Sequence, residues 1–133
     1  MNKKILIVSS NYYTEVSKNL ELGSINTLKE HNLDYDLINA PGCYEVPYLI
    51  KKNLKNYNGF IALGCIIKGE TYHFEVIANE TSKKIMDISV DNLVPIGFGI
   101  LTCYNLDQAI IRSDIKQKNK GREATLACLK LLE

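Results

Sequence analysis

The sequence of 133 residues contains no tryptophan, only three prolines and no long apolar segment. No apolar run approaches the roughly 18 to 20 residues that a membrane-spanning helix needs, so we expect no contact with a membrane. The apolar run at residues 5–8 is followed at once by polar residues, which does not fit a signal peptide. These absences lead us to expect a cytoplasmic protein.

An excess of charge of either sign is also missing, because the formal net charge is +1. A nucleic-acid-binding surface would be strongly basic, so we expect no nucleic-acid partner. The four cysteines are far apart, with no Cys-x-x-Cys pair, which predicts neither disulfides nor a zinc site in a cytoplasmic protein. We expect them to be small buried side chains. Cys43 and Cys103 each follow an expected strand, a position that could bring them to a pocket.

What is present is an ordinary globular composition, with 46% hydrophobic and 23% charged residues. The length predicts one domain over residues 1–133, large enough for a real core. Short apolar runs predict strands at residues 5–9, 35–38, 60–67 and 94–101. Between them the spacing predicts helices over residues 16–28, 45–54, 73–88 and 106–113, the last opened by Asn105 as cap. A final helix is expected after Gly121, with an apolar face made by Ala124, Ala127, Cys128 and Leu131.

Strands that alternate with helices predict an α/β fold with a mainly parallel four-stranded sheet and helices on both faces. In such sheets ligands bind at the carboxyl ends of the strands. One of these ends is particularly informative, because Gly69-Glu-Thr71 follows the third strand and His73 lies in the first turn of the next helix. A helix N-terminus can bind phosphate, and a histidine there can transfer protons. The simpler alternative is a surface or capping histidine.

Four blocks of the sequence resemble the 6,7-dimethyl-8-ribityllumazine synthase family, in its order and at its spacing. They are Pro41-Gly-Cys-Tyr-Glu-Val-Pro47, Gly69-Glu-Thr-Tyr-His-Phe74, Gly97-Phe-Gly-Ile-Leu-Thr102, and Gln108-Ala-Ile-Ile-Arg112 with Asn119-Lys-Gly121. The resemblance implies a flavodoxin-like three-layer α/β/α sandwich. It also implies the penultimate step of riboflavin biosynthesis, in which a ribitylamino-pyrimidinedione condenses with 3,4-dihydroxy-2-butanone 4-phosphate, without metal or organic cofactor.

The resemblance further implies a homopentamer with active sites between neighbouring subunits, in which pentamers stay free, pair as decamers or close into 60-subunit capsids. His73 would transfer protons. The phosphate would be held by Gly69, Glu70, Thr71 and Arg112. The pyrimidine and ribityl chain would be held by Tyr12, Cys43, Tyr44, Glu45, Ile67, Phe98 and Lys120. The residues alone allow plainer interpretations: Thr71 as a helix cap, Arg112 as a complement to a helix dipole, and Tyr12 or Phe98 as core aromatics.

Two departures from the family pattern stand in the expected site. Residues 11–13 are Asn-Tyr-Tyr where relatives more often have Arg-Phe-Asn, and Cys43 replaces Ala or Ser. Two other functions remain open on the sequence: an archaeal-type riboflavin synthase, which dismutates two lumazines, and a non-catalytic flavin-binding or shell relative. The Gly69–His73 block and Arg112 argue against the first, because dismutation involves no phosphate.

Overall fold

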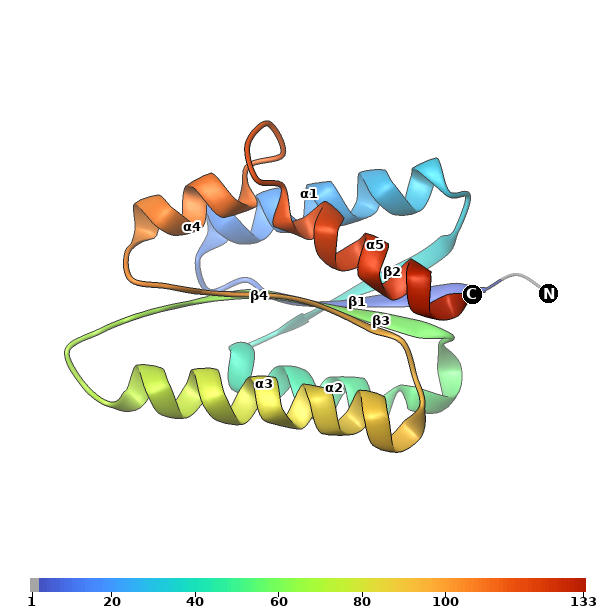
Figure 1. Ribbon diagram of the computed structural model, residues 1–133, viewed down its shortest axis with the longest axis horizontal. Coiled ribbons are helices and arrows are strands. Elements are labelled where there is room, and N and C mark those ends of the chain that lie inside the picture. The colour runs from blue at the N-terminus through green and yellow to red at the C-terminus, as the bar shows by residue number, and fades with distance from the viewer. Residues whose placement is uncertain (1–2) are drawn as a thin grey trace.

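The computed structural model describes residues 3–133 and contains a parallel sheet between two helical layers (Figure 1). The strands are β1 (Lys4–Ser10), β2 (Asp34–Ala40), β3 (Gly59–Ile67) and β4 (Ile96–Cys103). All neighbouring strands pair in parallel, in the order β2-β1-β3-β4. This confirms the expected α/β sandwich with four parallel strands.

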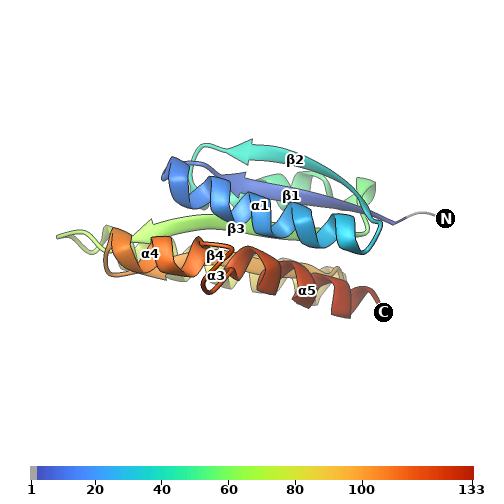
Figure 2. The same ribbon diagram turned by 90° about the horizontal axis from the view of Figure 1, so that it is seen from above.

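Helices cover both faces of the sheet (Figures 1 and 2). One face carries α1 (Thr14–Glu30), α4 (Leu106–Ser113) and α5 (Lys120–Leu132), and the other carries α2 (Val46–Lys52) and α3 (His73–Asn92). Short 3-10 turns at Cys43–Glu45 and Leu54–Asn56 flank α2. Within residues 3–133, no helix is long and apolar enough to cross a membrane.

The central strands owe their place to continuous apolar sequence. In β1 every residue after Lys4 is buried, and in β3 every residue before Ile67 is buried, as expected for strands covered on both faces. Side chains alternate between the two faces of a strand. Ile5 and Ile7 therefore join the core under α1 and α5, whereas Leu6 and Val8 join the core under α2 and α3.

Several local predictions are confirmed. The helical spacing at residues 16–28 lies within α1, and its apolar positions are buried. Asn105 caps α4, with its side-chain oxygen accepting a hydrogen bond from the Gln108 N–H at 2.9 Å. All four cysteines are buried free thiols. The helix expected over residues 45–54 is shorter, because the chain forms separate 3-10 turns on either side of α2.

The prediction for the last helix was wrong in two respects. The helix begins at Lys120, so Gly121 lies inside it rather than before it. A Cβ at Gly121 would collide with the Leu20 carbonyl oxygen, so glycine here permits α5 to approach α1 closely. This contact fixes which face of α5 is buried: Thr125 is covered, whereas Ala127 and Leu131 are exposed.

Candidate active site

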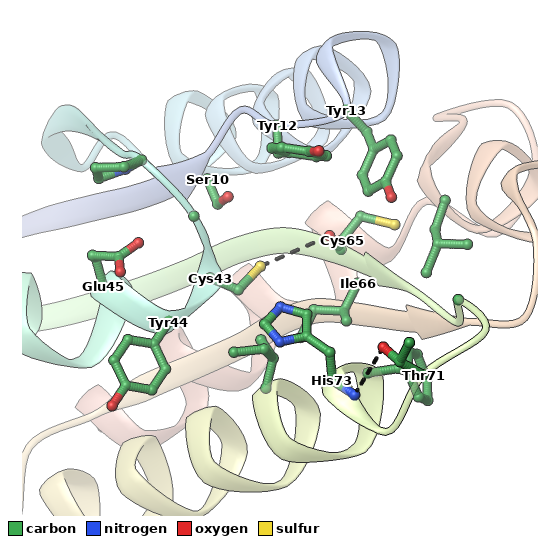
Figure 3. A pocket seen from close by; sticks show the side chains of 16 residues that line it. Ser10, Tyr12, Tyr13, Cys43, Tyr44, Glu45, Cys65, Ile66, Thr71 and His73 are labelled. Atoms are coloured by element: carbon green, nitrogen blue, oxygen red, sulfur yellow. Dashed lines mark hydrogen bonds between the residues drawn. The ribbon is translucent and has the colours of Figure 1, made fainter.

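A cavity of about 640 Å³ opens at the carboxyl ends of β1, β2 and β3 (Figure 3). Its walls come from the segment that follows each of these strands, together with the first turns of α3. This is the edge of the sheet where ligands of parallel α/β proteins bind. The cavity therefore lies at the strand ends where the expected parallel sheet and the chemistry of the sequence both predicted a site.

Most of the expected site residues line this one cavity. They are Tyr12, Cys43, Tyr44, Glu45, Ile67, Gly69, Thr71 and His73. Tyr12 is 73% exposed, so its ring face is open to a ligand. In the close-up, Glu45 and Tyr44 lie on one side of the cavity and Thr71 on the other, with His73 between them (Figure 3). An aromatic surface, a carboxylate and an imidazole thus face one volume.

Four expected residues lie outside the lining of this cavity: Glu70, Phe98, Arg112 and Lys120. Arg112 is on α4, on the opposite face of the sheet from α3, and its Nη1 donates to the Gln108 carbonyl at 3.2 Å. Lys120 pairs with Glu123 at 3.0 Å. Phe98 is 44% exposed on the edge strand β4. Within one chain, the expected phosphate-binding arginine does not join His73.

The segment from Gly69 to His73 has the form of an anion-binding helix start. The helix α3 begins at His73, its N-cap residue Tyr72 makes no side-chain cap bond, and a Cβ at Gly69 would meet nothing within 4 Å. Thr71 Oγ1 accepts a hydrogen bond from the His73 N–H at 3.4 Å, which is long for a cap. The first-turn N–H groups are left largely without intrahelical partners and can bind an anion.

A cation that the sequence reasoning missed stands at the start of this segment. The Lys68 N–H donates to the Cys103 carbonyl at 2.9 Å, which ties the end of β3 to β4. Its ammonium lies over the Tyr104 ring, 5.5 Å from the centroid, in a cation–π arrangement. Lys68 thus supplies a positive charge from the segment between β3 and α3, although it is not among the residues that line the cavity.

The floor of the cavity is made of neutral polar and apolar groups. Burial raises the pKa of the Cys65 thiol to about 12, and burial also raises the pKa of the Cys43 thiol. Both thiols are therefore protonated at neutral pH. The Cys43 thiol donates weakly to the Cys65 carbonyl at 3.9 Å. A floor of this kind suits a planar neutral ring better than a charged ligand.

Sequence reasoning missed several lining residues: Ser10, Tyr13, Cys65, Ile66, Phe74 and Ile77. Ser10 and Tyr13 belong to the segment after the first strand, so the rule of strand ends could have found them. The Tyr13 ring meets that of Tyr12 edge-on, with centroids 5.0 Å apart. Ile77 lies one helical turn after His73 and therefore faces the same side of α3.

Known proteins with similar sequences match almost the whole chain. The family model for 6,7-dimethyl-8-ribityllumazine synthase matches residues 2–133. A 6,7-dimethyl-8-ribityllumazine synthase of Bartonella bacilliformis is 41% identical over 97% of this chain and 88% of the relative. Those of Novosphingobium aromaticivorans and Kosmotoga olearia are 43% and 41% identical, over 97% and 96% of this chain and 94% and 85% of the relatives. These matches over most of each chain agree with the sandwich fold and confirm the resemblance: the chain belongs to the 6,7-dimethyl-8-ribityllumazine synthase family.

Proposed function

We propose that this protein condenses 5-amino-6-(D-ribitylamino)uracil with 3,4-dihydroxy-2-butanone 4-phosphate to form 6,7-dimethyl-8-ribityllumazine, releasing phosphate and water. It would thereby perform the penultimate step of riboflavin biosynthesis. One observation carries the proposal beyond family membership: Tyr12, Glu45 and His73, from three different strand ends, line a single cavity. That cavity offers a ring platform, a hydrogen-bond acceptor and a proton carrier together.

The pyrimidine would bind at the Tyr12 side of the cavity. The exposed Tyr12 ring would stack on the planar pyrimidine, while Cys43 and Ile67 form walls around it. Glu45, an acceptor-only carboxylate, would take hydrogen bonds from the hydroxyls of the ribityl chain, with Tyr44 beside it. This end of the cavity contains no cation, in keeping with an uncharged substrate.

The butanone phosphate would bind at the helix end of the cavity. Backbone N–H groups of Gly69, Glu70 and Thr71, together with the positive end of α3, would hold the phosphate. The Glu70 side chain is exposed and would point away, because a carboxylate beside a phosphate is repelled. Arg112 would clamp the phosphate through its planar fork of donors.

The chemistry requires several proton transfers, and His73 would make them. The 5-amino group attacks the ketone carbon, and loss of water gives an imine. Phosphate then leaves, and the ribitylamino nitrogen closes the second ring with loss of a further water. An imidazole can accept the proton of the attacking amine and return it to the leaving oxygen. Positioning of two substrates in one cavity would supply much of the remaining acceleration.

We also propose a cytoplasmic homopentamer in which a neighbouring subunit completes the cavity with Phe98, Arg112 and Lys120. The reason is that these three residues lie outside the cavity of their own chain. Support comes from apolar side chains exposed on α3 and just after it, which resemble an uncovered interface: Val76, Met86, Val90 and Leu93. Four free thiols fit a reducing compartment.

The test is to follow lumazine formation from the two substrates and to compare matched variants. His73→Asn should lower kcat by about 10²- to 10⁴-fold, because a general acid–base group is lost. The chain has two histidines, and His31→Asn serves as control because His31 lies at the end of α1, away from the cavity. Full activity in His73→Asn would contradict the assigned role.

A second pair of variants tests the phosphate clamp. Arg112→Gln should raise KM for the butanone phosphate and leave the affinity for the pyrimidine nearly unchanged. Arg122→Gln is the control, because Arg122 lies between α5 and α1, away from the cavity, and loses a surface ion pair with Glu30 and a 3.3 Å hydrogen bond to Thr27 Oγ1. If the intact wild-type oligomer does not accelerate lumazine formation, the proposed function is wrong, and lumazine alone becomes the next substrate to test.

A further inference from the structure

Two buried side-chain hydroxyls within residues 3–133 have no hydrogen-bond partner, Ser10 and Thr81. Buried polar groups without partners are rare in folded proteins, because each loses its bonds to water and gains nothing in return. Thr81 lies in α3 away from the cavity, whereas Ser10 lines it. The unpaired hydroxyl of Ser10 therefore stands in the wall of the site itself.

The backbone holds Ser10 firmly in this place. Ser10 is the last residue of β1, is 1% exposed, and is paired with Ala40 of β2. Its carbonyl accepts a buried hydrogen bond from the Ser17 hydroxyl of α1 at 2.7 Å. These bonds fix the backbone at the end of the central strand, so the Ser10 side chain stays in the buried wall of the cavity. Its hydroxyl is thus held in position without a partner.

Ser10 shares the space above Gly64 with the thiol of Cys43. A Cβ built on Gly64 would lie 2.7 Å from Cys43 Sγ and 3.2 Å from Ser10 Cβ. The close-up shows Ser10 and Cys43 side by side on the cavity wall (Figure 3). A thiol is a weak hydrogen-bonding group, and that of Cys43 is directed to the Cys65 carbonyl at 3.9 Å. Burial raises the pKa of this thiol and the Ser10 hydroxyl offsets part of that rise, so the two groups are in contact, but the contact lies outside hydrogen-bond geometry and leaves the hydroxyl without a proper partner.

We propose that Ser10 is a further positioning residue, whose hydroxyl hydrogen-bonds the polar edge of the pyrimidinedione ring once the Cys43 side chain turns from its place above Gly64. This inference rests on the proposed function. A hydroxyl can donate one bond and accept others, and the edge of a uracil ring alternates carbonyl acceptors with an N–H donor. Binding would give the hydroxyl the partner that it lacks in the free protein, so part of the binding free energy comes from relieving an unpaired group.

The neighbouring serine provides a matched control. Ser9 is fully buried like Ser10, but its hydroxyl donates to Glu21 Oε2 at 2.6 Å on the α1 face, and it does not line the cavity. Ser10→Ala should weaken binding of 5-amino-6-(D-ribitylamino)uracil by about 3- to 10-fold. It should leave the unfolding midpoint of the free protein unchanged or raised. Ser9→Ala should do the reverse, lowering the midpoint and leaving the affinity unchanged.

Two more variants separate binding from packing. Thr81→Val removes the other unpaired hydroxyl and should not change the affinity. Ser10→Cys replaces the hydroxyl by a slightly larger thiol that forms weaker hydrogen bonds, so its dissociation constant should lie between those of wild type and Ser10→Ala. If Ser10→Ala does not fold, Ser10→Cys alone carries the test, with a weakened affinity as the expected result.

The outcomes distinguish this inference from the proposed function. If wild type forms lumazine but Ser10→Ala or Ser10→Cys binds the pyrimidine as tightly as wild type, the inference is wrong and the function stands. If Ser10→Ala lowers the midpoint of the free protein as much as Ser9→Ala does, the hydroxyl is not unpaired and the inference also fails. If wild type forms no lumazine, the proposed function fails first, before any serine variant is compared.

Discussion

Gly64 is the position where one added methyl group should disturb the cavity most directly. Its Cβ would lie 2.7 Å from Cys43 Sγ, closer than real Cβ contacts, and 3.2 Å from Ser10 Cβ. Overpacking of this kind costs typically about 1–3 kcal/mol. Loss of backbone freedom in the unfolded chain returns roughly 0.4–1 kcal/mol when glycine becomes alanine. Gly64→Ala should therefore be destabilised by about 1–2 kcal/mol.

The collision is with a side chain, so a second substitution should relieve it. Cys43→Ala alone deletes one buried heavy atom, a loss comparable to Ile→Val at about 0.5–1.5 kcal/mol. In the double variant the new methyl group occupies the space that the sulfur leaves. We expect the double variant to be about as stable as wild type. Its loss of stability would then be about 2 kcal/mol smaller than the sum of the losses in the two single variants, and this difference is the coupling free energy.

The assay is urea unfolding of all four proteins, with free energies taken from the midpoints. Protomer concentration must be equal throughout, because the stability of the proposed oligomer would depend on it. Gly97→Ala is a useful contrast, since its Cβ would meet the backbone of Ala124, and Cys43→Ala should not rescue it. Additive effects of Gly64→Ala and Cys43→Ala, to within about 0.5 kcal/mol, would refute the reasoning.

Three other predictions follow from individual contacts. The Tyr57 hydroxyl donates a hydrogen bond of 2.7 Å to Asp36, and this bond, followed by the one from Lys4, lowers the pKa of Asp36 below its ordinary value. The ionised Asp36 therefore stabilises the fold at neutral pH, and this stabilisation is lost as pH falls through the pKa of the folded state. In Tyr57→Phe, NMR titration should show a higher Asp36 pKa, and the stability deficit should shrink toward acid pH; an unchanged pKa would contradict this. Burial raises the pKa of the Cys65 and Cys128 thiols, and all four cysteines are buried. Ellman's reagent should therefore react slowly with the native protein and should react rapidly with four thiols once the protein is denatured. Gly121→Ala should lower the thermal midpoint by the equivalent of about 1–3 kcal/mol, because its methyl group meets the Leu20 carbonyl; an unchanged midpoint would show that α5 can move away.

The sequence predicted most of the cavity because the relevant signals are local. Continuous apolar runs predicted the strands that form β1 and β3, and the rule that ligands bind at strand ends pointed to the segments around Tyr12, Glu45 and His73. The lining of the cavity contains residues from all three segments. Each of these inferences uses residues within about ten positions of one another, where periodicity and turn chemistry dominate.

Predictions failed where the deciding contact joins distant parts of the chain. Gly121 looked like a break between helices, but it lies inside α5, where the absence of a side chain lets Leu20 of α1 come close. The exposed Ala127 and Leu131 follow from the same contact. Helical spacing alone could not choose which side of this short helix would be covered.

The sequence by itself determined the order of strands and helices, the buried central strands, the edge of the sheet where the cavity lies and the family. Only the tertiary structure decided that Ser10 has an unpaired hydroxyl beside Cys43 and Gly64, and that Arg112 lies on the far face of the sheet from the helix that begins at His73. The physical reason is that periodicity arises between near neighbours in the chain, whereas the satisfaction of a buried polar group depends on the register and packing of segments that meet only after folding.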